Sequence, residues 1–175
     1  MIFGYDEFPD KKFLVHIDIL EKDNSFLYGA FNFIFQEKIY PAFGTGWTIN
    51  LITEYMAGLL QFSEGEFYYE NSDILDGREL FKEAVISRLG YFYDTPHQII
   101  PDDDFKKKYP QKIGVELEVA ELGDSGLEIY VFKGKCGEYL VFHYNDIVTK
   151  VNIDINNLKI LVNKIYKFIN EINVQ

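Results

Sequence analysis

The chain has few of the residues on which most enzyme sites depend. Its 175 residues include one cysteine, three histidines and two arginines. Cys136 has no second cysteine with which to form an internal disulfide or a zinc knuckle, which favours a reducing compartment. Phosphate and carboxylate substrates are usually held by arginine forks, so the scarcity of arginine argues against substrates of those classes.

Long apolar runs and known catalytic motifs are also missing. No stretch approaches the roughly 20 apolar residues that span a bilayer, and the first residues do not form a secretory signal. The sequence contains no Gly-x-Ser-x-Gly, no His-Glu-x-x-His and no glycine-rich dinucleotide pattern. We therefore expect a cytoplasmic protein that is not an enzyme and that needs no cofactor or metal.

What the chain has in excess is negative charge, and that charge is unevenly distributed. The whole sequence carries 28 acidic and 17 basic residues, a formal net charge of -11. Residues 54–104 hold 12 acidic and 3 basic residues, whereas residues 105–175 hold 9 and 10. Nucleic acids and anionic lipids are repelled by such a surface. We expect a basic protein as the partner, rather than a nucleic acid or a membrane.

Alternation of apolar and polar residues predicts two groups of antiparallel strands. Residues 13–19 and 27–35 form a predicted hairpin, with a polar turn at 21–25 and a short third strand at 38–40. In the last third of the chain, the pattern predicts a meander of strands at residues 115–119, 127–132, 139–144 and 147–153.

Helical spacing of apolar residues predicts about three α-helices. They cover residues 49–60, 80–89 and 155–172, with Gly90 as a C-terminal cap and Asp154 as an N-cap. Residues 91–109 are expected to form a long loop. Strands in runs, with helices segregated from them, indicate an α+β fold in which an N-terminal hairpin and a C-terminal meander form antiparallel sheet. The length suits one domain, residues 1–175.

Histidine offers one alternative, enzymatic interpretation. His16 and His143 lie on predicted strands, where a histidine is more often structural than catalytic. His97 lies in the acidic loop and is the best candidate for a general base, although no nucleophile is near it in the sequence. A small cytoplasmic hydrolase that uses His97 with a carboxylate therefore remains an alternative function.

Two acidic motifs have simpler interpretations than chemistry. Asp102, Asp103 and Asp104 are consecutive, whereas calcium loops space their ligands at alternate positions, so a solvated loop is favoured. Glu116 and Glu118 lie on one face of a predicted strand, about 7 Å apart. Paired carboxylates can perform acid–base catalysis, but a strand with one wet face explains them more simply.

Several short segments, in order along the chain, resemble a known family. They comprise the opening before the first strand, a strand with an internal glycine, the start of the second helix and two late strands: residues 1–4, 27–33, 74–81, 128–132 and 138–143. In these segments the chain resembles immunity protein 42, a family of bacterial polymorphic-toxin immunity proteins.

The resemblance implies a small cytoplasmic protein encoded beside a toxin, such as one delivered by contact-dependent inhibition. Immunity proteins of this kind bind the toxin's C-terminal domain and block its active site, and they need no chemistry of their own. Many of the toxins are nucleases with basic nucleic-acid-binding faces. An acidic immunity surface would complement such a face.

We predict that the partner docks on residues 64–104, where acids are interleaved with tyrosines. Tyrosine is favoured at interfaces because it combines apolar area with a hydroxyl group. A purely solubilising surface, or an adaptor that pairs through an exposed strand edge, are the alternatives. The predicted partner-binding residues are Glu64, Glu66, Tyr68, Glu70, Asp73, Tyr93, Asp94, Asp102, Asp103 and Asp104.

Overall fold

The computed structural model describes residues 1–42, 44, 46–92, 95–99 and 101–174, with only the backbone described at 91–92, 95–99 and 102. The predicted N-terminal hairpin is confirmed as β2 (Phe13–Asp23) and β3 (Phe26–Phe35). They form the centre of a first sheet in the order β1-β2-β3-β4, with β5 also on β3. The flanking strands are β1 (Ile2–Phe3), β4 (Lys38–Tyr40) and β5 (Trp47–Thr48).

The predicted C-terminal meander is confirmed as a second antiparallel sheet in the order β11-β10-β9-β8. Its strands are β8 (Val115–Glu116), β9 (Leu127–Lys133), β10 (Glu138–Tyr144) and β11 (Ile147–Asn152). A 3₁₀ helix, η4 (Ala120–Ser125), occupies the connection from β8 to β9. Among the described strands β8 pairs only with β9, so it forms an open edge of this sheet.

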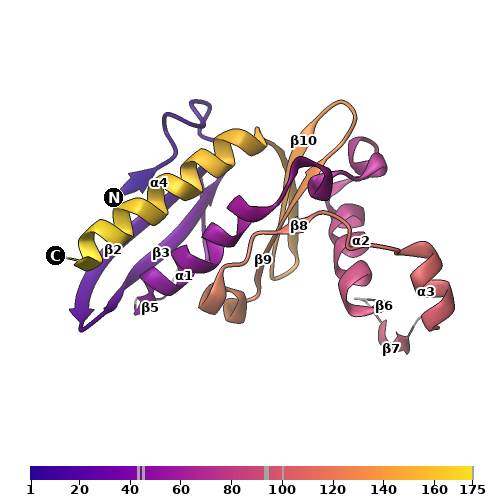
Figure 1. The fold of residues 1–175 in the computed structure, drawn as a ribbon, viewed down its shortest axis with the longest axis horizontal. Helices are drawn as coiled ribbons and strands as arrows, with labels where there is room; N and C mark the ends of the chain where they lie inside the picture. Colours follow the sequence, from indigo (N-terminus) through magenta and orange to yellow (C-terminus); the bar gives the residue numbers. More distant parts are fainter. Residues whose placement is uncertain (43, 45, 93–94, 100, 175) are drawn as a thin grey trace.

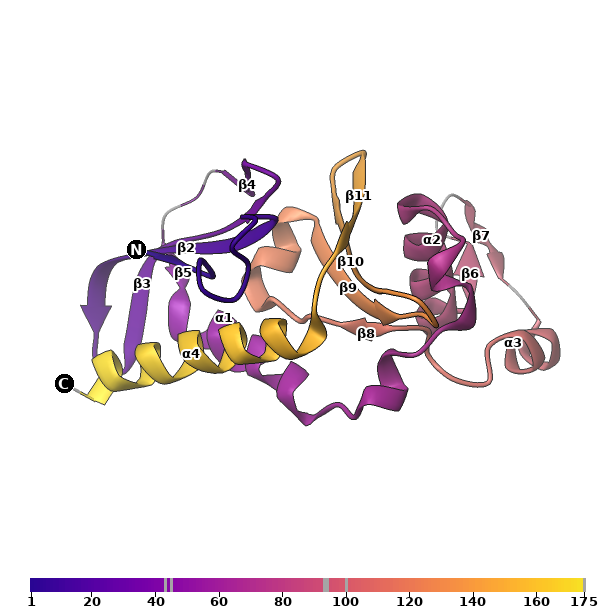
Figure 2. The same cartoon turned by 90° about the horizontal axis from the view of Figure 1, so that it is seen from above.

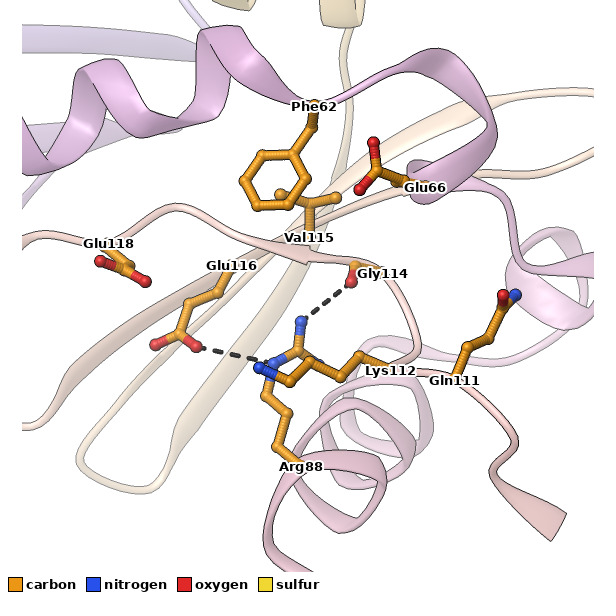
Figure 3. A pocket seen from close by; sticks show the side chains of 9 residues that line it. All are labelled: Phe62, Glu66, Arg88, Gln111, Lys112, Gly114, Val115, Glu116 and Glu118. Carbon is orange, nitrogen blue, oxygen red and sulfur yellow. Dashed lines mark hydrogen bonds and ion pairs between the residues drawn. The ribbon is translucent and has the colours of Figure 1, made fainter. Parts of the chain in front are cut away.

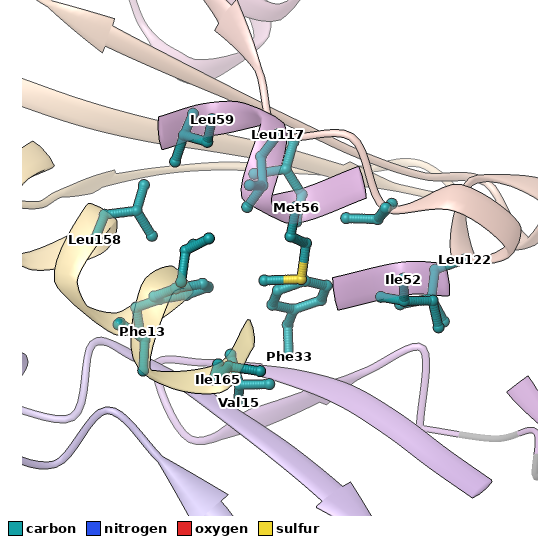
Figure 4. Close-up of a cluster of buried hydrophobic side chains, with 14 of the residues drawn as sticks. Phe13, Val15, Phe33, Ile52, Met56, Leu59, Leu117, Leu122, Leu158 and Ile165 are labelled. Atoms are coloured by element: carbon teal, nitrogen blue, oxygen red, sulfur yellow. The ribbon is translucent and has the colours of Figure 1, made fainter. Parts of the chain in front are cut away.

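Helices α1 (Ile49–Ala57) and α4 (Ile155–Val174) pack side by side over one face of the first sheet (Figures 1 and 2). As predicted, Asp154 caps α4: its Oδ1 accepts a hydrogen bond from the Asn157 backbone N–H at 2.9 Å. The main core lies beneath the two helices and is rich in phenylalanine (Figure 4). Phe35 and Phe142 stack with ring centroids 3.9 Å apart and so join the two sheets.

Helix α2 (Gly77–Leu89) covers the opposite face of the second sheet and forms a second core with it. Asp76 and Glu79 form a capping box at its start, and the predicted cap Gly90 ends it with φ of 72°. The second sheet is therefore buried on both faces, which explains the near-continuous apolar run of β9. This second core comprises Leu80, Phe81, Ala84, Val85, Tyr130, Phe132 and Val141.

The prediction of a long loop at residues 91–109 was wrong. This segment contains a strand pair, β6 (Tyr91–Phe92) and β7 (Thr95–Ile99), followed by α3 (Asp102–Lys108). Short elements of this kind have too few apolar positions for a periodic signal. In α3 the acids occupy the first turn and three lysines the last, an arrangement that the helix dipole favours. The α+β fold class is confirmed, and none of the described helices is long and apolar enough to cross a membrane.

Candidate partner-binding surface

The segment between α1 and α2 carries five of the predicted partner-binding residues, four of them on short 3₁₀ helices and Tyr68 between two of these. The 3₁₀ helices are η1 (Gly58–Gln61), η2 (Glu64–Phe67) and η3 (Glu70–Asp73). Phe67 is fully buried and anchors the segment. Tyr68 and Glu70 are exposed, as a docking surface requires.

Two acids of this segment are bound to the protein's own groups. Glu64 Oε2 lies 2.8 Å from Lys133 Nζ, and this hydrogen-bonded ion pair lowers the pKa of Glu64. Glu66 accepts hydrogen bonds at Oε2 from the backbone N–H of Ser63, at 2.8 Å, and from its hydroxyl, at 2.9 Å. These bonds complete a capping box and lower the pKa of Glu66. Both side chains nevertheless remain at the surface.

Asp73 is turned toward the protein and holds the turn between β9 and β10. Its carboxylate accepts backbone N–H bonds from Lys135, Cys136 and Gly137 at 2.8–3.1 Å, and a hydroxyl bond from Tyr139 at 2.9 Å. Desolvation acts to raise the pKa of Asp73, but these hydrogen bonds outweigh it and the pKa is lowered. A Cβ at Gly134 would collide with this carboxylate, which explains the glycine there. The geometry gives Asp73 a structural role.

The other predicted acids lie far from this segment. Asp103 and Asp104 are exposed on α3, at the end of the molecule beyond α2 (Figure 1). Tyr93 and Asp94 lie outside the described residues, as do the side chains of Asp102 and His97. The fold therefore does not bring the described members of the predicted set into one cluster.

The open edge of β8 lines a groove that the sequence analysis did not identify (Figure 3). Its volume is about 270 Å³, and Phe62 and Glu66 line it opposite β8. Glu116 and Glu118 line it from β8 and the residues that follow, while Val115, Leu117 and Val119 point into the core. The predicted alternation is confirmed, but the strand ends at Glu116 and not at the predicted residue 119. Arg88, Gln111, Lys112, Gly114 and Val115 complete the lining.

Arg88 fixes the shape of this groove. Its guanidinium donates hydrogen bonds to the carbonyl oxygens of Ala84, Ile113 and Gly114 at 2.8–2.9 Å, and it lies 4.8 Å above the Tyr130 ring. Its Nε is also 3.6 Å from Glu116 Oε2. These contacts fasten the start of β8 to α2.

Three carboxylates lie close together on this face of the second sheet. Burial raises the pKa of Glu116, and the neighbouring Glu118 and Glu128 raise it further, against the opposing effect of Arg88. Glu128 accepts a hydrogen bond from the Tyr130 hydroxyl at 3.2 Å. In the described part of the chain, no group of histidine, cysteine, aspartate or glutamate residues is arranged to hold a metal ion.

A signal for this groove was present in the sequence. In a meander the first and last strands form the edges of the sheet, and the strand with Glu116 and Glu118 is the first of the four. The contribution of Arg88 had no such signal, because the bonded carbonyl groups are about 25 residues away. His16 and His143 lie on β2 and β10, as predicted, and His143 stacks on Phe81 at 4.5 Å.

Comparisons with known proteins agree over nearly the whole chain. The family model described as immunity protein 42 matches residues 1–174. An uncharacterised protein of Pasteurella multocida (strain Pm70) is 36% identical over 150 residues, which are 85% of this chain and 90% of that protein. The fold is similar to the crystal structure of CdiI from Burkholderia dolosa AUO158. The TM-score is 0.68 at 11% identity, with 96% of this chain and 99% of that chain covered.

Proposed function

This chain belongs to the immunity protein 42 family, and we propose that it neutralises a cognate toxin by covering that toxin's active or substrate-binding site. The observation that carries the proposal is the family match over residues 1–174. Binding alone would suffice for this function, and the chain would act without catalysis, cofactor or metal. The site of action would be the cytoplasm, where an incoming toxin domain would reach its target.

We further propose that the toxin domain is a nuclease with a basic surface. The net charge of -11 supports this, since an acidic protein complements the face with which a nuclease holds nucleic acid. The exposed acids Glu64, Glu70, Asp103 and Asp104 would steer that face during encounter. The same charge disfavours direct binding to nucleic acid or to an anionic membrane.

A direct test uses the protein encoded by the gene immediately upstream in the native genome. The C-terminal domain of that protein should co-purify with this chain. At an equimolar ratio, this chain should abolish the cleavage of DNA or RNA by that domain in vitro. A matched control is an immunity protein from an unrelated toxin, which should neither bind nor inhibit. The proposed function is wrong if the upstream domain is active and remains uninhibited at a large excess of this chain.

The hydrolase alternative gains no support from the described residues. The side chain of His97 lies outside them, and no described observation joins that residue to a carboxylate. The strand-edge alternative has a specific observation in its favour, the open edge of β8, but an edge of this kind also serves an immunity protein.

A further inference from the structure

The edge of β8 presents backbone hydrogen-bonding groups that its own sheet does not use. The Leu117 N–H donates to the Ile129 carbonyl of β9 at 2.9 Å. Since successive residues of a strand point their backbone groups to opposite sides, those of Glu116, the last residue of β8, point away from β9. In the described part of the chain no strand lies beyond β8 in this sheet, and Glu116 lines the groove.

We propose that this edge is where the toxin domain docks, by adding an extended basic segment as a further strand of the second sheet. The inference rests on the proposed function and specifies its binding mode. The added strand would exchange backbone hydrogen bonds with Glu116 and would extend the pairing past the present end of β8 to Glu118. Its site is distinct from the acidic residues on α3, which lie at the end of the molecule.

The charge of the groove determines what such a segment would carry. Glu116 and Glu118 point to the same face of the sheet as Glu128. All three residues also line a second hollow of about 210 Å³ along the same edge. The guanidinium of Arg88 is already directed at three carbonyl groups. Because Arg88 also lies 3.6 Å from Glu116 and Lys112 lines the groove, Glu118 is the carboxylate that a lysine or arginine of the partner would meet first.

The opposite face of the edge carries an exposed aromatic ring, with Glu66 beside it. Phe62 lies above Val115 on the side away from Glu116 (Figure 3), and 37% of its surface is exposed. Side chains of an added strand alternate between the two faces. The segment that fits would therefore alternate basic residues, facing Glu116 and Glu118, with apolar residues that cover Phe62.

Hydrogen exchange of individual backbone amides, followed by NMR with the purified upstream toxin domain as the probe, tests the backbone contacts. On binding, the amides of Glu116 and Glu118 should exchange at least tenfold more slowly. The Leu117 amide, already bonded to Ile129, provides an internal control and should change little. This alternation distinguishes strand addition from a side-chain contact, which would not follow the period of two.

A charge reversal tests the choice of partner segment. The variant Glu116→Lys/Glu118→Lys should bind the toxin domain at least tenfold more weakly. The control Glu21→Lys/Glu171→Lys makes the same change of charge at exposed positions of β2 and α4 and should bind within about twofold of the wild type. Circular dichroism and urea unfolding check that both variants fold, and the exchange measurement on the wild type stands without them.

Three results would overturn the inference, and they have different meanings. If the toxin domain binds tightly while the Glu116 and Glu118 amides keep their exchange rates, docking is elsewhere and the proposed function stands. If these amides are already protected in the free protein and it sediments as a dimer, a second copy of this chain occupies the edge. If the upstream toxin domain does not bind at all, the inference and the proposed function both fail.

Discussion

The segment from Glu64 to Asp73 and the edge strand β8 are both acidic, but they use their carboxylates differently. In the segment, Glu64, Glu66 and Asp73 are each bonded to groups of the protein itself. On the other surface Glu116 pairs with Arg88 at 3.6 Å, whereas among the described residues no hydrogen bond or ion pair holds the side chain of Glu118. The number of acidic residues in a segment therefore does not measure the negative charge that a partner can meet, because some of the carboxylates are already bonded to groups of the protein itself.

The largest expected effect is on the framework of the groove. Arg88→Leu should lower the free energy of unfolding by about 2–4 kcal/mol, because it leaves partly buried carbonyl groups of Ile113 and Gly114 without a donor. Urea unfolding at neutral pH measures the change. Arg78→Leu, on the exposed side of the same helix, is the matched control and should alter stability by less than about 0.5 kcal/mol. Equal effects would show that Arg88 does not hold β8.

The next effect concerns the bound carboxylate of Asp73. Asp73→Asn replaces an acceptor of four hydrogen bonds by a group that also presents N–H donors to the turn. We expect a clear drop in melting temperature and faster amide exchange at Lys135, Cys136 and Gly137. Glu70→Gln, an exposed neighbour, should leave both unchanged. A turn that stays protected in Asp73→Asn would contradict the structural role.

Association rates compare the acidic surfaces as steering elements. Charge reversal of Asp102, Asp103 and Asp104 together should slow binding of the toxin domain severalfold at low salt, and the difference should shrink as salt screens the charges. The triple reversal of Glu64, Glu66 and Glu70 is the parallel variant for the other segment, and stopped-flow mixing measures both. If both triple variants associate at the wild-type rate in low salt, these residues do not guide the partner.

The pH dependence of stability should have opposite signs on the two surfaces. Because the pKa of Asp73 is lowered from its ordinary value of 3.8, its ionised carboxylate stabilises the fold at pH values above 3.8. This stabilisation is lost as the pH falls through the folded-state pKa of Asp73. Because the pKa of Glu116 is raised from its ordinary value of 4.5, its protonated form stabilises the fold relative to the ionised form at pH values below 4.5. This contribution is lost as the pH rises through the folded-state pKa of Glu116.

Variants separate these two contributions. Glu116→Gln should be slightly more stable than the wild type at pH 7, with no difference below its ordinary pKa. Asp73→Asn should be less stable at pH 7, and its deficit should shrink as the pH falls below 3.8. Urea midpoints from pH 3 to pH 7 provide the measurement, and differences of the same sign would contradict the assignment.

The smallest effect is expected at the exposed ion pair of the segment. Glu64→Gln should leave the urea midpoint within error of the wild type, since solvent and salt screen the Glu64–Lys133 pair and Lys133 keeps Glu138 at 3.3 Å. If the midpoint falls as far as it does in Asp73→Asn, the exposed Glu64–Lys133 ion pair contributes as much to stability as the hydrogen bonds of Asp73 do, which would contradict the comparison.

Local structure followed from the sequence wherever the signal was local. Alternation at residues 13–19 and 27–35, the cap at Asp154 and the glycine at Gly90 depend on neighbours within a few positions, and all are confirmed. The strand pair and α3 between residues 91 and 109 were missed, because elements of two to seven residues are too short to show a clear periodic pattern.

The sequence by itself determined the α+β class, the resemblance to the family, and an excess of negative charge. Only the tertiary structure decided which carboxylates remain available. Asp73 is bonded to a turn more than 60 residues away, and Arg88 holds the start of an edge strand 25 residues away. Such contacts depend on how sheets and helices pack, and no periodicity or spacing along the chain encodes them.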